Sequence, residues 1–115
     1  LFELVVKNVY ILTVNIAGLK TGGTVGELWE KHQAFARAVA EDVMDIQFCL
    51  IGKTFKREDL IAGMVKAFHG DLGHKCMGRA APDRLKRALE QADQFGLDVK
   101  TLREIRKHQD RAAAA

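Results

Sequence analysis

Near the start of the chain, apolar side chains occupy almost every even position of residues 2–17, which limits what this segment can form. At the even positions of residues 2–17 every side chain except Asn8 is apolar, namely Phe2, Leu4, Val6, Tyr10, Leu12, Val14 and Ile16. A period of two places these side chains on one face of a β-strand, and the many β-branched residues favour the same structure. Because sixteen residues are long for a strand, we expect either one bent strand, which the unbroken even phase favours, or a hairpin turning at Lys7-Asn8.

The rest of the chain predicts helices around a second strand. Thr24 and Glu27 have the spacing of a capping box, which marks the start of a helix expected to run to about Val43. Residues 45–52 again place apolar side chains at even positions and predict a strand. Helical spacing predicts three further helices, over residues 54–69, 82–95 and 99–111, the last with Asp98 as its cap.

This order of elements predicts an α+β fold, β(β)αβααα, in a single domain of residues 1–111 followed by an Ala-rich tail at 112–115. A β-α-β start favours a parallel strand pair with a right-handed crossover. We expect a small sheet of two or three strands packed by amphipathic helices. Since so narrow a sheet leaves exposed edges, we also expect a homodimer in which the strand at 2–17 pairs with its copy.

Composition narrows the class of protein. A chain of 115 residues is long enough to bury a hydrophobic core. No uncharged apolar run approaches the length of a membrane span, so neither a membrane helix nor a membrane partner is expected. The apolar start has no basic leader, and no signal peptide is expected. Two cysteines, Cys49 and Cys76, do not make a disulfide framework, and this usage suits the cytoplasm.

Basic residues gather towards the end of the chain. The formal net charge is +3, from 18 basic and 15 acidic residues, and residues 75–111 hold 10 of the basic against 6 of the acidic ones. At 100° per residue, one side of the last predicted helix carries a row of cations, which are Lys100, Arg103, Lys107 and Arg111. Such a row suits the phosphates of a nucleic acid, and Arg84 and Arg87 on the preceding helix extend it. An ordinary amphipathic surface helix has the same pattern.

Residues 95–111 also resemble part of a known protein family. The matching residues are Gly96, Asp98, Val99, Lys100, Leu102, Arg103 and Ile105, which fit the Gly-x-Asp-Val-Lys-x-Leu-Arg segment of GapR-like bacterial nucleoid proteins. The resemblance covers about 17 of the 115 residues, and residues 1–79 have no counterpart in that all-helical family. In that family the segment lies in a helical dimer that encircles duplex DNA, so the resemblance implies DNA contacts from the last helix.

A polar loop holds the densest group of possible metal ligands, which are His69, Asp71, His74 and Cys76. Imidazole, carboxylate and thiolate all bind zinc, and a loop can bring them together. Their spacing fits no zinc signature, so a zinc site stands as an alternative to an ordinary solvated loop.

No signature of a catalytic nucleophile is present, and we expect a protein that binds rather than catalyses. The leading hypothesis is a small non-enzymatic nucleic-acid-binding or regulatory accessory protein that uses the basic C-terminal helix. One alternative is a protein-interaction or assembly subunit without a nucleic-acid role. The other is a small metal-binding protein or metalloenzyme that uses the loop at 69–76.

Overall fold

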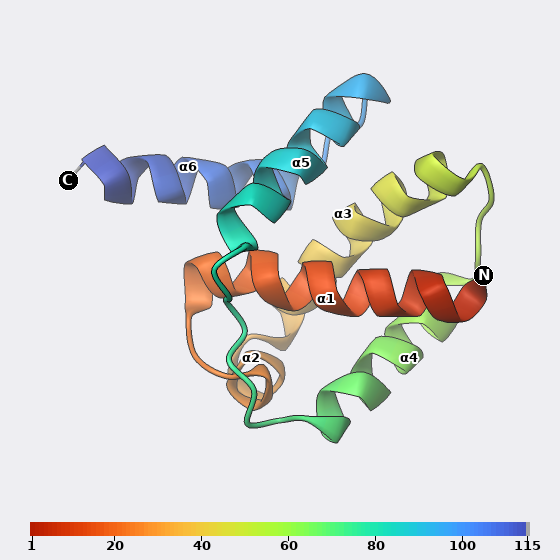
Figure 1. Cartoon of the computed structure of the whole chain (residues 1–115), viewed down its shortest axis with the longest axis horizontal. Coiled ribbons are helices and arrows are strands. Elements are labelled where there is room, and N and C mark those ends of the chain that lie inside the picture. Colours follow the sequence, from red (N-terminus) through yellow and green to blue (C-terminus); the bar gives the residue numbers. More distant parts are fainter. Residues whose placement is uncertain (115) are drawn as a thin grey trace.

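The computed structural model describes residues 1–114, and these form six α-helices (Figure 1). The helices are α1 (Phe2–Thr21), α2 (Val25–Lys31), α3 (Gln33–Ile51), α4 (Arg57–Gly70), α5 (Ala81–Gln94) and α6 (Lys100–Ala114). Within residues 1–114 the β-structure amounts to one isolated bridge, between Thr24 and Lys75. The predicted α+β fold is therefore wrong, and so are its sheet and the pairing of two copies through a strand at 2–17.

The helix α1 replaces the predicted long strand because its burial follows a helical repeat. Four of its buried residues lie four positions apart on one helix face, namely Val5, Val9, Thr13 and Ala17. The even positions do not form one face, since Leu4 is 56% exposed while Ile16 is fully buried. α1 packs against all five other helices, so apolar side chains are buried on several of its sides. Burial on several sides removes the helical period from the sequence.

The second predicted strand, residues 45–52, is the C-terminal part of α3 and the residue that ends it. α3 continues past Val43 and stops at Gly52, whose φ of 68° is the left-handed conformation typical of a helix end. Leu50, expected on the same strand face as Ile46 and Phe48, is 44% exposed while the other two are buried. The helix predicted from Thr24 to Val43 is divided into α2 and α3 at His32, which has non-helical backbone angles.

The capping box at Thr24 and the three later helices are confirmed, unlike the two predicted strands. Thr24 Oγ1 accepts the Glu27 backbone N–H at 3.2 Å, and Glu27 Oε1 accepts the Thr24 backbone N–H at 3.1 Å, which is the expected capping box. The helices predicted at 54–69, 82–95 and 99–111 are present as α4, α5 and α6. α6 runs on through Ala114, so residues 112–114 of the predicted tail are helical, and Ala115 lies outside the described residues.

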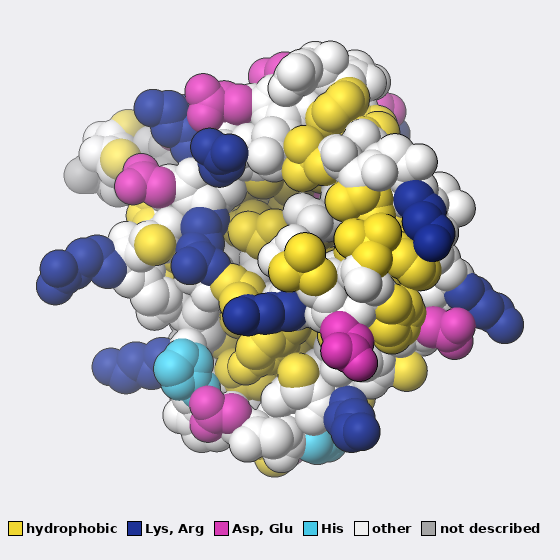
Figure 2. All heavy atoms as spheres, turned by 45° about the vertical axis from the view of Figure 1, so that its right-hand side comes forward, with side chains coloured by type: hydrophobic (Ala, Val, Ile, Leu, Met, Phe, Trp, Pro, Cys, Tyr) yellow, Lys and Arg dark blue, Asp and Glu magenta, His cyan; other side chains and the backbone are white. Residues whose placement is uncertain are grey.

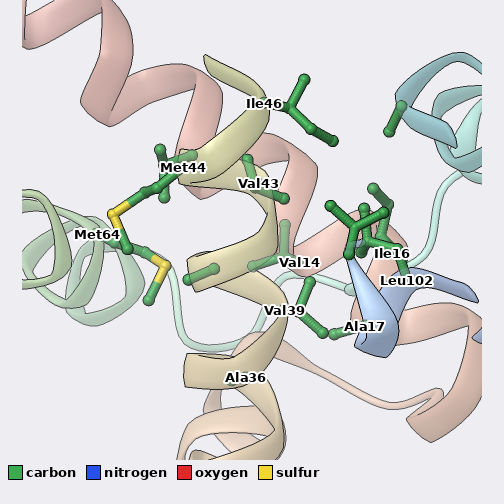
Figure 3. Close-up of a cluster of buried hydrophobic side chains, with 14 of the residues drawn as sticks. Val14, Ile16, Ala17, Ala36, Val39, Val43, Met44, Ile46, Met64 and Leu102 are labelled. Atoms are coloured by element: carbon green, nitrogen blue, oxygen red, sulfur yellow. The ribbon is translucent and has the colours of Figure 1, made fainter. Parts of the chain in front are cut away.

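The core lies between α1 and the helices that surround it. Figure 3 shows α3 at its centre, with Met44 beside Met64 of α4 and Val39 beside Ala17 of α1. Ile16 of α1 lies beside Leu102 of α6 in the same view. In Figure 1, α4 and α5 lie on opposite sides of α1. α1 therefore separates a face formed with α4 from a face formed with α5.

By length and composition, α1 is also the one helix within residues 1–114 that is long and apolar enough to cross a membrane. No membrane helix was expected from the sequence because charged residues such as Glu3 and Lys7 interrupt the apolar run, yet α1 as a whole has the length and apolar composition of a span. In the structure this helix is the central element of the core.

The loop that connects α4 to α5 passes close to the end of α1. We refer to residues 71–80 as the 71–80 loop. A Cβ added to Gly18 would lie 2.8 Å from Cys76 Cβ and 2.9 Å from Met77 N, so only glycine allows this approach. Val25 N–H donates to His74 O at 2.8 Å, and Cys76 N–H donates to Gly23 O at 3.0 Å. These contacts hold the loop against α1 and the start of α2.

Candidate anion-binding groove

An open groove of about 380 Å³ lies between α1 and α5. We call it the α1–α5 groove, and its lining residues are Asn8, Ile11, Leu12, Gln47, Arg84, Arg87, Ala88 and Gln91. Ile11, Leu12 and Ala88 give it an apolar part. Figure 2 shows a hollow with hydrophobic side chains on its floor and Lys or Arg side chains at its edge. A cleft of this size that combines an apolar part with several convergent polar groups is a candidate ligand site.

A second hollow, of about 520 Å³, adjoins this groove at the 71–80 loop. It is lined by Asn15, Arg84 and residues 74–80. Arg84 lines both hollows, which makes them neighbours. Asn8, Ile11 and Asn15 follow one another at helical spacing along the same face of α1. The two hollows therefore lie next to each other, on either side of Arg84, and we call them together the concave strip.

The concave strip carries positive charge without a carboxylate. Its cations are Lys75, Arg79, Arg84 and Arg87, and none of its lining residues is Asp or Glu. In residues 1–114 none of these four cations takes part in an ion pair. A concave surface lined by one sign of charge concentrates the opposite charge near it. The strip is therefore suited to an anion, and its guanidinium groups to phosphate or carboxylate in particular.

The hollow between α5 and α6 differs in this respect. Its lining mixes Asp83 and Asp110 with Lys86 and Arg106, so its charges largely compensate one another. The excess of positive charge is thus a property of the strip rather than of every hollow on α5.

Three side-chain amides line the α1–α5 groove, those of Asn8, Gln47 and Gln91, and the first two are hydrogen-bonded to each other. Asn8 Nδ2 on α1 donates to Gln47 Oε1 on α3 at 3.1 Å. Gln47 is only 6% exposed although it lines the groove. The sequence singled out Asn8 only as a break in the apolar alternation, where it suggested a turn. The structure places Asn8 in the first half of α1, facing the groove. Gln47, by contrast, stood inside a predicted strand with nothing to mark it.

Among the cations of the predicted row on α6, Arg103 uses its guanidinium group for contacts within the protein. Its Nη2 lies 2.8 Å from Asp93 Oδ1 and donates to Leu97 O at 3.0 Å, while its Nε donates to Asp98 O at 2.7 Å. Asp93 belongs to α5, and Leu97 and Asp98 lie in the connection to α6. Arg103 therefore stabilises the corner between these two helices.

The other cations of the row lie apart from the concave strip. Lys107 Nζ is 3.4 Å from Glu104 Oε1, on the surface of α6. Lys100 and Arg111 form no ion pair within residues 1–114. None of the three lines either hollow of the strip. The structure thus brings Arg84 and Arg87 together on the groove and leaves the α6 cations on a separate surface.

The four predicted metal ligands do not converge. His69 lies in the last turn of α4, and His74 Nδ1 is 3.6 Å from Asp71 Oδ2 on the exposed part of the loop. Cys76 is buried, and burial raises the pKa of its thiol to about 11, which keeps it protonated. Within residues 1–114 no three His, Cys, Asp or Glu side chains are placed to share a metal ion.

The segment that resembles GapR-like proteins forms the corner between α5 and α6 and most of α6. Gly96 and Val99 have positive φ angles of 66° and 38°, so the chain turns sharply there. The N-terminus of α6 is capped by Asp42 of α3 rather than by the expected Asp98. Comparisons of the chain with models of protein families, with curated proteins and with solved structures found no match.

Proposed function

We propose that the protein is a non-enzymatic nucleic-acid-binding protein that contacts phosphates through the concave strip. The observation that supports this proposal is the lining of the strip, with four cations and no carboxylate. Phosphate contacts from Lys and Arg supply most of the affinity of such proteins, and guanidinium groups bind phosphate with two parallel hydrogen bonds. A regulatory accessory role in the cytoplasm would suit a small domain of this kind.

The proposal assigns different roles to the predicted cations. Arg84 and Arg87 on α5 stand at the centre of the interface because they line the groove and form no ion pair with a carboxylate of residues 1–114. Lys75 and Arg79 extend the interface along the 71–80 loop. On α6, Lys100, Lys107 and Arg111 form a second surface that a longer nucleic acid could reach, while Arg103 has a structural role.

The test is fluorescence anisotropy of labelled duplex DNA, single-stranded DNA and RNA across a salt series. The double variant Arg84→Gln/Arg87→Gln is compared with Lys56→Gln/Lys66→Gln, which changes the net charge equally. Lys56 and Lys66 precede and lie on α4, on the other side of α1. We expect the strip variant to weaken binding, and each lost duplex contact to flatten the slope of log K against log salt by about 0.9.

Two results would contradict this assignment. If the α4 control weakened binding as much as the strip variant, the effect would be one of net charge alone. If Lys107→Gln/Arg111→Gln weakened binding and the strip variant did not, the interface would lie on α6 instead. Absence of binding to all three probes at low salt would overturn the proposed function as a whole.

A second candidate, a protein-interaction subunit, is favoured by apolar side chains near the N-terminus. Leu1, Leu4 and Leu50 are among the most exposed large hydrophobic residues of the described chain. Figure 2 shows hydrophobic side chains gathered on the side of the molecule that carries this end. The two candidates separate in the anisotropy experiment, because a subunit with this role alone has no reason to bind nucleic acid.

A further inference from the structure

The Asn8 and Gln47 side chains leave hydrogen-bonding groups unused inside the α1–α5 groove. Each primary amide carries an NH2 group and a carbonyl oxygen. The single hydrogen bond between them joins the NH2 of one to the oxygen of the other. Whichever way the two amides are turned, one oxygen has no partner within residues 1–114, and one NH2 likewise. Within residues 1–114, Thr13 Oγ1 is the side-chain polar atom that is sealed from solvent without a partner. The unused amide atoms of Asn8 and Gln47, which both line the groove, are therefore not sealed from solvent.

Each of the two amides still presents an N–H donor beside a carbonyl acceptor, and such a pair is the complement of a nucleobase edge. Asn and Gln side chains recognise bases through such paired hydrogen bonds, and unpaired bases also stack on the flat guanidinium groups of arginine. The same groove provides both kinds of contact, since Arg84 and Arg87 line it together with the amide pair. Its apolar residues, Ile11 and Leu12 among them, suit the face of a base.

The groove is built by three helices rather than by a flexible loop. Asn8 comes from α1, Gln47 from α3 and the two arginines from α5. Side chains carried on packed helices hold their positions more closely than side chains on loops, which is what discrimination between similar ligands requires. The burial of Gln47 fixes the amide pair further.

We propose that the α1–α5 groove holds one unpaired nucleotide of a bound nucleic acid. The amide pair of Asn8 and Gln47 contacts the edge of the base, and Arg84 and Arg87 contact its phosphate or its face. This inference rests on the proposed function and narrows it to a single strand or to a duplex with an unpaired base. A base in a continuous duplex is stacked and paired, and it can enter such a groove only after it leaves the stack.

The experiment compares single strands with duplex and removes the amide pair without changing charge. The probes are labelled homopolymers of deoxyadenosine, deoxycytidine and thymidine, about 12 nucleotides long, and a duplex of equal length. Gln47→Met replaces the amide with an apolar side chain of similar size. Gln33→Met, at the exposed start of the same helix, is the matched control. Asn8→Leu tests the pair from α1, and circular dichroism shows which variants are folded.

We expect the unmodified protein to bind single strands more tightly than duplex and to prefer one base. Gln47→Met and Asn8→Leu should each weaken binding of the preferred strand roughly tenfold, within the range that one paired hydrogen-bond contact to a base provides. The salt dependence should stay the same in both variants, since the phosphate contacts remain. Gln33→Met should bind as the unmodified protein does.

Different binding results would contradict the nucleotide pocket and the phosphate contacts. Equal binding of all homopolymers and of the duplex, unchanged in folded Gln47→Met or Asn8→Leu protein, would overturn the nucleotide pocket and leave phosphate binding by the concave strip in place. No binding of any probe at low salt would overturn both. A loss of affinity in Gln47→Met that is the same for every probe, including the duplex, would also count against recognition of a base.

Discussion

The carboxylate of Asp42 on α3 accepts the backbone N–H of Thr101, 59 positions later in the chain, at 2.9 Å. The same oxygen, Oδ2, accepts the backbone N–H of Leu102 at 3.2 Å. The first N–H groups of a helix have no partner within the helix, and a capping side chain normally comes from the residue just before it. Here a distant residue supplies the cap, which ties the start of α6 to α3.

Replacing this cap should destabilise the protein. Asp42→Ala removes the acceptor from two N–H groups, and the loss of a helix cap costs about 1–2 kcal/mol. Asp42→Asn keeps a carbonyl oxygen in the same place and should lose less. Urea unfolding followed by circular dichroism measures both values. Equal stability of Asp42→Ala and the unmodified protein would mean that the cap does not contribute.

The Asp42 carboxyl should also make stability depend on pH. Burial raises its pKa, and the nearby carboxylates of Asp45 and Glu41 raise it too, while the hydrogen bonds from Leu102 and Thr101 lower it. The net shift is upward, so the folded protein holds this proton more tightly than the unfolded chain does. Stability contributed by such a group falls as pH rises from the unfolded pKa, about 3.9, through the folded one.

Comparison with Asp42→Asn isolates this contribution, because the variant has no proton to lose. The free energy of unfolding of the unmodified protein, minus that of the variant, should decrease with rising pH across this window and become constant above it. Urea unfolding at a series of pH values gives this difference. An increase with pH would show that the hydrogen bonds outweigh burial and that the folded pKa is depressed.

The contrast between Asp42 and Thr24 shows what the sequence could predict. The capping box of Thr24 and Glu27 was predictable because both partners lie within one turn. The cap by Asp42 was not, because it depends on how α3 packs against α6. The same distinction applies to the first helix. α1 is buried on several sides, so its sequence lacks the one-sided apolar stripe by which a surface helix is recognised.

Some residues of the candidate site could be predicted from the sequence, and others belong to it only because of how the helices pack. Arg84 and Arg87 could be selected from the sequence because both are cations on one predicted helix. Asn8 and Gln47 belong to the site only because α1 and α3 place them together, and no spacing along the chain shows this. Arg103 matched the predicted cation row, yet its contacts with Asp93 and two carbonyl groups give it a structural role.

Thr13 offers a test of the core of α1. Its hydroxyl is fully buried and has no hydrogen-bond partner among the described residues. A buried hydroxyl without a partner costs about 1–3 kcal/mol. Thr13→Val replaces it with a methyl group of similar shape and should raise the free energy of unfolding by about 1 kcal/mol. Thr13→Ser keeps the hydroxyl and leaves a gap, so it should lower stability in the same urea experiment.

Gly18 tests the contact between α1 and the 71–80 loop. In Gly18→Ala the new methyl group would lie 2.8 Å from Cys76 Cβ and 2.9 Å from Met77 N, and such overpacking costs about 1–3 kcal/mol. Gly70→Ala at the end of α4 is the control, because a Cβ there meets no atom within 4 Å. We expect a lower thermal midpoint for Gly18→Ala alone. An unchanged midpoint would show that the loop moves away without cost.

Comparing the stability of Arg103→Gln with that of Arg111→Gln should show which of the two α6 arginines has a structural role. Arg103→Gln removes the guanidinium that bridges Asp93 and the carbonyl groups of Leu97 and Asp98, so it should destabilise the corner. Partial exposure of this pair limits the loss to about 1 kcal/mol. Arg111→Gln makes the same change of charge without breaking an ion pair, so its urea midpoint should equal that of the unmodified protein. Equal midpoints for the two variants would show that the contacts of Arg103 do not hold the corner, and the residue would return to the set of cations available for phosphate.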